Sequence, residues 1–317
     1  MMMMMMMRHR FRFVALRWLF VVWFLLTGAS PLEIYVSPEG DDGNAGTSSS
    51  LPLRTLGAAG DAFALMGESA SASSLSLFLR RNATFVNDPL NIVTRSGNVI
   101  VGSYGDERLP RPLIQHARGI NNDAVACVKL EGNITNVRVS DLHVSGCSKG
   151  VVLDATVASF NISVERNVFQ DIRTPFFRYT PPNPKWAPAI SMTGAALASV
   201  TVSNNIAARI DVFFSSTTHI TGMNLDSNTV QQCSGNCYAL GQGVGIVMQN
   251  SVLLQDNSLR LFMYGTTDVI VGGLTGDNKV INNDFNQRGE YPGGPDGCAF
   301  DFETAATGFL VSGNSFS

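Results

Sequence analysis

The chain is poor in charge, histidine and lysine, and each scarcity argues against a class of function. Only 15% of its 317 residues are charged while 45% are hydrophobic, so disorder is not its dominant state. Four histidines, one of them within the first ten residues, argue against a multi-histidine zinc site. Four arginines lie in the first thirty residues, where no acid occurs, so the remainder carries 18 basic against 25 acidic residues, a net charge of −7. This acidity disfavours nucleic-acid binding through a basic surface.

Long helices and a second membrane-length segment are also missing. Thirty glycines and thirteen prolines, in a chain rich in Asn and Ser, indicate many turns and argue against an all-α bundle. No apolar stretch long enough to cross a membrane follows residue 30. We therefore expect no stable membrane insertion beyond the N-terminal leader.

Residues 1–30 have the pattern of a secretory signal peptide. A basic segment, Arg8–Arg12, precedes the apolar core Trp18–Leu26 and the small residues Thr27–Ser30, in the order that signal peptides follow. The rival interpretation is an uncleaved anchor, but Arg17 interrupts the apolar run and leaves a core too short to span comfortably. We expect a secreted, extracellular protein, with membrane anchoring through the N-terminal segment as the alternative.

Sequons and cysteines agree with that route. Three Asn-x-Ser/Thr triplets begin at Asn82, Asn133 and Asn161 and predict a glycoprotein if the source is a eukaryote. An oxidising compartment favours disulfide pairing, with one cysteine left over. The five cysteines are Cys127, Cys147, Cys233, Cys237 and Cys298. The short spacing from Cys233 to Cys237 suits either a small closed loop or two unpaired thiols.

A repeat runs through the last two thirds of the chain. Seven units combine alternating apolar residues with a terminal Asn in all but the first: Val137–Leu142, Ile162–Asn167, Val200–Asn205, Met223–Asn228, Val252–Asn257, Asn278–Asn283 and Phe309–Asn314. Their end positions are 23 to 38 residues apart, which is typical of a solenoid with one irregular coil per unit.

A second short strand precedes each unit. These strands are Val128–Glu131, Val151–Asp154, Ile190–Thr193, Val212–Phe214, Ile246–Gln249, Val269–Val271 and Phe300–Glu303. Such strands bury no complete face alone and must stack on their neighbours, which predicts an all-β parallel β-helix. The rival antiparallel sandwich requires hairpin turns with Asn at loop tips. We expect each recurring Asn to adopt left-handed backbone angles and to hydrogen-bond to its equivalent one coil along.

The first coils add a family resemblance. Ile34–Thr47 supplies a Tyr-Val strand and a Gly/Asp/Asn-rich loop, and Leu51–Leu56 supplies a Pro-x-x-Thr-Leu segment. In these features the chain resembles right-handed parallel β-helix proteins of the pectin-lyase-like superfamily, and Gly102–Gly105 followed by Arg111–Ile114 is similar to their first coils. The resemblance implies one right-handed solenoid domain over residues 31–317, with a short capping helix near 53–65. Its activity stays open, because this fold hosts lyases, hydrolases, epimerases and adhesins.

The last repeat unit reaches the final residues of the sequence. Gly313–Ser317 lies within a unit that is expected to continue into further strands. We expect either a truncated chain or a last coil that is short, and a monomer in solution.

Loops between strands supply the candidate substrate-binding residues. The longest spacing between units carries Arg173, Arg178, Tyr179, Lys185 and Trp186, and a later loop carries Arg288 and Tyr291. Arginine donates to carboxylates and hydroxyls, and aromatic faces stack on sugars. These loops, with the stretch from Gln231 to Gly243, are predicted to border a substrate groove on one side of the solenoid. The alternative is that the loops differ in length without forming a binding groove.

The candidate catalytic residues are carboxylates. Alternation directs Phe300 and Phe302 inward and leaves Asp301 and Glu303 outward, two strand steps or roughly 7 Å apart, with Asp296 just upstream. Two carboxylates at that separation serve as acid and base in glycoside hydrolysis, or as ligands of Ca²⁺. The alternative is an exposed strand face that is polar for solubility. The same outer position in other coils is predicted to hold Glu131, Asp154, Thr193 and Gln249.

These patterns together favour an extracellular carbohydrate-active protein that acts on a polysaccharide, of glycoside hydrolase or polysaccharide lyase type. A lyase needs a base, for which Lys129 and Lys185 are the lysines in suitable positions. The alternative is a non-catalytic glycan-binding or surface adhesion β-helix. The sequence leaves open whether the protein is an enzyme at all.

Overall fold

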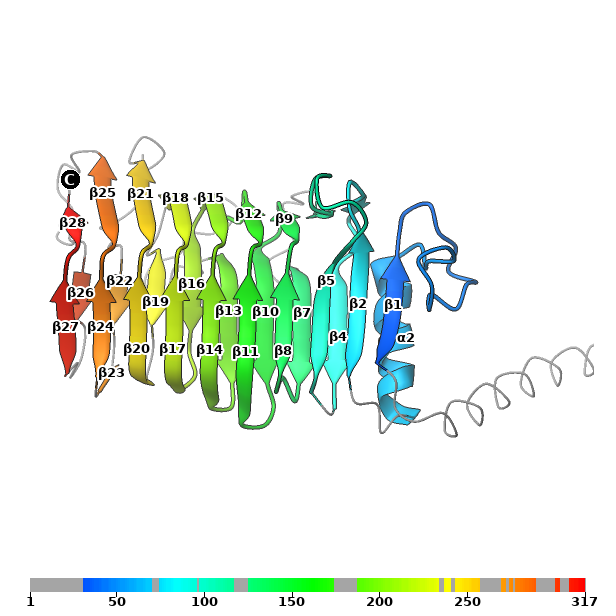
Figure 1. Ribbon diagram of the computed structural model, residues 1–317, viewed down its shortest axis with the longest axis horizontal. Helices are drawn as coiled ribbons and strands as arrows, with labels where there is room; N and C mark the ends of the chain where they lie inside the picture. Colours follow the sequence, from blue (N-terminus) through cyan, green and yellow to red (C-terminus); the bar gives the residue numbers. More distant parts are fainter. Residues whose placement is uncertain are drawn as a thin grey trace, which may run out of the picture.

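The computed structural model describes most of the chain after residue 30. The described residues are 31–69, 74–95, 97–116, 125–173, 187–233, 237–240, 243–256, 269–271, 274–275, 277–288, 300–302 and 308–316. They form one helix and three parallel sheets that stack coil upon coil along the long axis (Figure 1). The predicted fold, a right-handed parallel β-helix, is confirmed.

Each sheet takes one strand from successive coils. Sheet A contains β1 (Leu32–Val36), β2 (Leu75–Arg80), β5 (Val99–Tyr104), β8 (Val137–Ser140), β11 (Ser159–Glu165), β14 (Leu197–Ser203), β17 (Ile220–Asp226), β20 (Gly243–Gln249), β23 (Leu274–Thr275), β24 (Asn278–Ile281) and β27 (Phe309–Ser312). Sheet B contains β3 (Thr84–Val86), β6 (Leu113–Gln115), β9 (His143–Ser145), β12 (Val168–Gln170), β15 (Ile206–Ile210), β18 (Thr229–Cys233), β21 (Val252–Asp256), β25 (Asp284–Arg288) and β28 (Ser315–Phe316). Sheet C contains β4 (Leu90–Thr94), β7 (Ala126–Gly132), β10 (Lys149–Ala155), β13 (Pro188–Gly194), β16 (Val212–Ser216), β19 (Tyr238–Leu240), β22 (Val269–Val271) and β26 (Phe300–Phe302).

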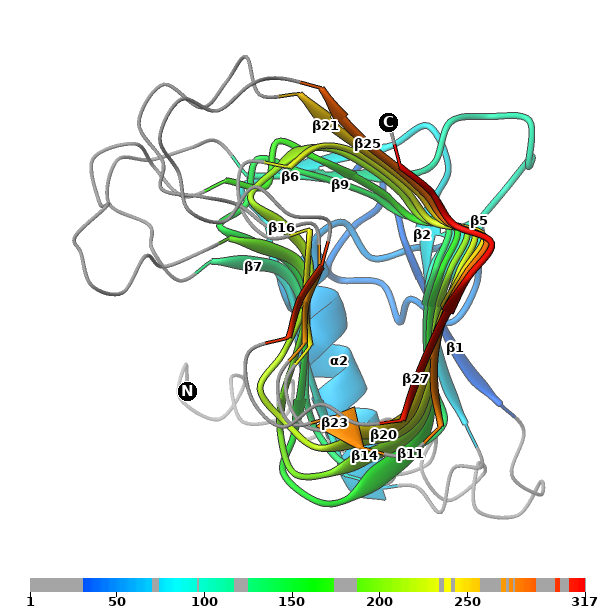
Figure 2. The same cartoon turned by 90° about the vertical axis from the view of Figure 1, so that its left-hand side faces the viewer.

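From β2 to β26 the chain runs through the sheets in the order A, B, C in each coil, and alternate residues face the enclosed core. In β11, Ile162 and Val164 are buried, and Val137 and Val139 occupy the same register positions one coil earlier. The view along the coils shows the three sheets enclosing this apolar interior (Figure 2). Burial of these stacked aliphatic columns is the main stabilising contribution, at about 25 cal/mol per Å² of apolar surface.

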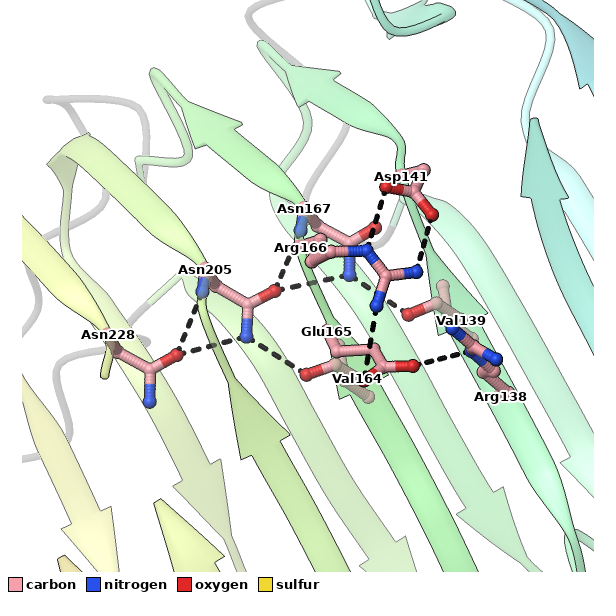
Figure 3. Close-up of polar contacts among 9 residues, drawn as sticks. All are labelled: Arg138, Val139, Asp141, Val164, Glu165, Arg166, Asn167, Asn205 and Asn228. Atoms are coloured by element: carbon pink, nitrogen blue, oxygen red, sulfur yellow. Dashed lines mark hydrogen bonds and ion pairs between the residues drawn. The ribbon is translucent and has the colours of Figure 1, made fainter. Parts of the chain in front are cut away.

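The bend from sheet A to sheet B carries the predicted asparagine ladder (Figure 3). The side chain of Asn167 donates to the Oδ1 of Asn205 at 3.2 Å, and that of Asn205 donates to the Oδ1 of Asn228 at 3.0 Å. Asn283 and Asn314 repeat the contact at 3.0 Å. The ladder hydrogen bonds are therefore confirmed.

The other half of the asparagine prediction is wrong. The left-handed backbone angle belongs to the residue before each ladder position, as at Arg166 (φ 55°), Asn204 (φ 55°) and Asn282 (φ 54°). Because that residue makes the bend, the ladder Asn keeps ordinary angles and points its amide inward, where it satisfies buried backbone groups.

One predicted unit was placed out of phase. Val252–Asp256 is a strand of sheet B, paired with β18, and Gly243–Gln249 is the sheet A strand of that coil. Ser251 occupies the ladder position, since its hydroxyl accepts from the backbone N of Asn228 at 3.3 Å. Asn257 lies outside the described residues. The error arose because a serine replaces the marker asparagine and an unrelated Asn follows six residues later.

The capping helix α2 (Leu56–Ser69) begins three residues later than predicted. Thr55 caps it by accepting from the backbone N of Ala58 at 3.1 Å, and the carboxylate of Asp88 accepts from the backbone N of Leu56 at 2.6 Å. Leu53 instead forms a bridge with Val36. Because these contacts fix the first turn at residue 56, the helix covers the open end of the coils (Figure 2) and hides unpaired backbone groups there.

Four of the five cysteines form two disulfides. Cys127 pairs with Cys147 across neighbouring coils, and Cys233 pairs with Cys237 within one bend. Their Cα atoms are 5.8 and 5.7 Å apart, within the usual range for a disulfide. The small-loop interpretation of the second pair is confirmed, while Cys298 lies outside the described residues.

Gly194 provides a sensitive test of coil stacking. Its φ is 91°, and a Cβ at this position would lie 2.1 Å from the carbonyl oxygen of Ala155 one coil earlier. We expect Gly194→Ala to lower the free energy of unfolding by at least about 3 kcal/mol, because a backbone atom must move. Gly222→Ala is the matched control, since φ is 68° but the nearest atom lies 4.0 Å away, and only the left-handed penalty of about 1 kcal/mol applies. Urea denaturation measures both, and equal losses would contradict the close approach.

Candidate functional site

Two carboxylates and a lysine gather on the outer face of sheet C. Because side chains alternate along each strand, Lys129 and Glu131 of β7 point away from the core while Val128 and Leu130 are buried. Glu131 is in register with Asp154 of β10, which is in register with Thr193 of β13. The predicted polar column is therefore real at these three positions.

Gln249 does not belong to this column. It lies at the end of β20 in sheet A, in register with Asp226. The prediction failed there because it depended on the phase of the misplaced unit. In sheet C, the column continues in the other direction to Val93, a valine with 55% of its surface exposed.

Short contacts order the column. The ammonium of Lys129 forms an ion pair with Glu131 at 2.5 Å, with both side chains still more than a third exposed. The hydroxyl of Thr193 donates to the Oδ1 of Asp154 at 3.0 Å. Glu131 and Asp154 are neighbours on adjacent strands, about 4.8 Å apart along the stack. These contacts hold two partly exposed carboxylates side by side on the outer face of sheet C.

One of the predicted carboxylates near the C-terminus, Asp301, has its backbone in sheet C, far from Glu131. Asp301 of β26 and Lys129 of β7 occupy the same register position in sheet C. The partners between them, one on each intervening strand, are Ile270, Ala239, Ser215, Ser191 and Val152. Six steps of about 4.8 Å separate them, or about 29 Å. Asp301 and the Glu131–Asp154 pair thus cannot act on one bond. Asp296 and Glu303 lie outside the described residues, as does the side chain of Asp301.

Most predicted binding residues also lie outside the described part of the chain. This holds for Arg178, Tyr179, Lys185, Trp186 and Tyr291, and for the side chain of Arg288, whose backbone ends β25. Arg173 is described and lies partly buried just after β12. The stretch from Gln231 to Gly243 is not one loop, because it contains β19.

The structure adds a buried carboxylate that the sequence pattern did not reveal. Asp211 lies between β15 and β16, at the bend from sheet B to sheet C, and is 3% exposed. Its Oδ2 accepts from the backbone N of Ala187 at 3.3 Å, and its own N donates to the carbonyl of Ile172 at 2.9 Å. It therefore ties together neighbouring coils at the bend where the chain enters sheet C. A single Asp between two strands gave no signal in the sequence.

A second charged group lies where sheet A bends into sheet B (Figure 3). Arg166 pairs with Asp141 at 2.7 Å, and Arg138 pairs with Glu165 at 2.5 Å. Burial opposes ionisation of Asp141, but the hydrogen bonds and charge of Arg166 hold the pKa of its carboxyl below the usual value. Nearby in sheet B, burial lowers the pKa of His143, which contacts the side chain of Gln170. These partners satisfy one another across coils, which is a structural role.

Neither a membrane span nor a metal cluster occurs in the described residues. Within that part of the chain no helix has both the length and the apolar character to cross a membrane. No group of three or more His, Cys, Asp or Glu side chains there is placed to hold a metal ion. The Ca²⁺ hypothesis at Asp301 and Glu303 involves side chains outside this part.

Comparison with known proteins gives a fold and no family. No protein-family model matches the chain, and no curated protein matches its sequence. Among solved structures, an alginate lyase from Paenibacillus sp. str. FPU-7 is similar, with a TM-score of 0.52, 9% identity, and coverage of 90% of this chain and 97% of that one. A GH136 lacto-N-biosidase from Eubacterium ramulus matches with a TM-score of 0.39, 12% identity, and coverage of 89% and 68%. At these identities the likeness to the lyase shows the β-helix fold alone.

Proposed function

We propose that the protein is an extracellular carbohydrate-active protein of the pectin-lyase-like superfamily that cleaves a polysaccharide along the outer face of sheet C. The observation that carries the proposal is the pair Glu131 and Asp154, two partly exposed carboxylates in register on adjacent coils. The superfamily assignment rests on the β-helix together with the resemblance of the first coils. The extracellular location rests on the N-terminal segment and agrees with two disulfides.

A linear polymer suits this face better than a small molecule. The strands of sheet C present the same outward position once per coil, at intervals of about 4.8 Å, which is of the order of one sugar unit. The exposed Val93 and the hydroxyl of Thr193 continue the column on either side of the carboxylates. A chain lying across the strands therefore meets an apolar contact, two acids and a hydroxyl in succession.

The spacing of the pair favours hydrolysis with retention of configuration. Retaining glycosidases place their two carboxyl groups about 5 Å apart, while inverting enzymes need about 6.5–9.5 Å to admit a water. Register partners on adjacent strands have backbones about 4.8 Å apart, which brings their side chains closer to the first condition than to the second. One carboxyl protonates the leaving oxygen while the other attacks the anomeric carbon, and water then releases the sugar. Lys129, paired with Glu131, fixes the direction of that carboxylate.

A non-catalytic glycan-binding function is the second candidate. It is favoured by the fact that both carboxylates already have partners, Lys129 for Glu131 and Thr193 for Asp154. Such a column binds sugar hydroxyls without supplying a free acid and base.

A polysaccharide panel separates these functions. The wild-type protein is incubated with alginate, pectate, xylan, cellulose and chitin, and binding, new reducing ends and unsaturated uronides are measured. Alginate is included because the Paenibacillus lyase is named for it. We expect reducing ends without unsaturated products, and retained configuration by NMR. Unsaturated products would show a lyase, with Lys129 as the candidate base, and binding without any product would show a binding module.

A further inference from the structure

A pocket of about 260 Å³ lies at the N-terminal end of the solenoid, where sheet A bends into sheet B. Three segments that are distant in sequence enclose it: the loop after β1, the end of β2 with the turn into β3, and the connection after β5. Its lining includes Glu39, Arg80, Arg81, Asn82, Thr84 and Leu109. The volume is below the roughly 300 Å³ at which pockets for drug-sized ligands begin, so it suits one small unit.

The walls supply both donors and acceptors. Arg80 and Glu39 form an ion pair whose side chains remain 48% and 77% exposed, so both still offer free hydrogen-bonding positions to a ligand. Arg81 is held in place, because its guanidinium donates to the carbonyl oxygen of Leu109 at 3.1 Å. Thr84 is exposed and points outward from β3. A carboxylate beside two guanidinium groups and a hydroxyl can bind several hydroxyls of one sugar ring.

An aromatic group adjoins the pocket on the outer face of sheet A. Tyr104 is in register with Arg80, and its ring lies 5.1 Å from that of Tyr35, which lies 5.8 Å from Phe78. Burial raises the pKa of Tyr104, with the charge of Arg80 opposing the shift and that of Glu39 adding to it. Within the described residues its hydroxyl is buried with no hydrogen-bond partner. Buried hydroxyls are normally paired, but Tyr104 does not line the pocket, so its hydroxyl is not counted among the groups that contact the ligand.

We infer that this pocket is a second, non-catalytic carbohydrate-binding site that takes a single sugar unit of a polysaccharide. Charged and hydroxyl groups that converge on a cavity the size of one small unit are the combination that binds the several hydroxyls of a sugar ring. The pocket lies at the bend of sheets A and B, whereas Glu131 and Asp154 lie on the outer face of sheet C. The site therefore retains the polymer and leaves the cleavage step unchanged. It depends on the proposed function only for the choice of probe.

The test compares pocket variants with matched controls. Thr84→Trp fills the pocket from an exposed position, and Thr229→Trp places the same side chain in the same outward column of sheet B, five strands along. Arg80→Ala breaks the pocket ion pair, and Arg108→Ala breaks an exposed pair with Asp106 outside the pocket. Calorimetric titration uses tetrasaccharides of mannuronate, galacturonate, xylose, glucose and N-acetylglucosamine. The protein is produced without N-glycans, because Asn82 lies on the pocket wall.

We expect wild type to bind at least one tetrasaccharide, Thr84→Trp to weaken that binding at least tenfold, and Arg80→Ala to weaken it severalfold. Both controls are expected to stay within twofold of wild type. A Thr84→Trp variant that binds as wild type does, or a wild type that binds none of the five at millimolar concentration, would overturn the pocket. The proposed function is tested by a different readout, the release of product. If wild type releases no product while Thr84→Trp still loses binding, the pocket is supported and the cleavage site on sheet C is contradicted.

Discussion

We expect Glu131→Gln and Asp154→Asn each to lower kcat/KM by about 10²–10⁴-fold on whichever polysaccharide the wild type cleaves. Each substitution keeps the size of the side chain but removes a group that must gain or lose a proton or attack carbon. Both side chains point outward, so the fold is expected to persist, with a change in unfolding free energy of about 0.5 kcal/mol or less. Initial rates and urea denaturation on the same preparations give the two quantities.

Asp226→Asn is the matched control for these substitutions. Asp226 is also an outward carboxylate that accepts a hydrogen bond, from Asn250 at 2.9 Å, but it lies on sheet A. Its rate is expected to stay within twofold of wild type. Activity near the wild-type level in both sheet C variants would instead identify the pair as a solvated structural column and direct the search to Asp301.

The second large effect concerns stability. Asn205 is fully buried, and its side chain accepts from the backbone N of Asn167 at 2.9 Å and donates to the carbonyl of Val164 at 2.9 Å. It also links to the next ladder residue, Asn228, at 3.0 Å. Asn205→Ala removes these partners of the backbone N of Asn167 and the carbonyl of Val164, while Asn228 still accepts from the backbone N of residue 205. We therefore expect a loss of about 3–5 kcal/mol in unfolding free energy, measured by urea denaturation.

Asn205→Ser is the graded control, because the chain itself uses a serine in the ladder. The hydroxyl of Ser251 accepts from the backbone N of Asn228 and donates to the carbonyl of Gln249. A serine at 205 is therefore expected to recover about half of the loss. If alanine and serine both cost less than about 1 kcal/mol, the ladder contributes little, and apolar stacking alone holds the bend.

The sequence predicted the fold well because the coil is a local repeat. Alternating apolar residues followed by Asn define both the inward face and the bend within about ten residues, and seven approximate copies reinforce one another. The pattern failed at Ser251, where the marker residue changed, and this one substitution shifted the assignment of two strands. It also misplaced the left-handed angle, since Arg166 and Ser227 are not residue types that normally signal such a conformation.

The candidate site was predictable only in part. Glu131, Asp154 and Thr193 were found because a parallel register follows from the repeat. The Lys129–Glu131 ion pair was not, because it depends on side-chain conformations that the pattern does not fix. The pocket around Arg80 and Glu39 was also missed: these residues are 41 positions apart in sequence, and no repeat relates them.

The most direct measurement is a crystal structure of the Glu131→Gln variant with a bound oligosaccharide of the substrate that the wild type cleaves. The proposed function predicts sugar density across the outer face of sheet C, with a glycosidic oxygen within hydrogen-bonding distance of Asp154 and the flanking units over Val93 and Thr193. Density confined to other faces of the solenoid, with the outer face of sheet C bare, would contradict it.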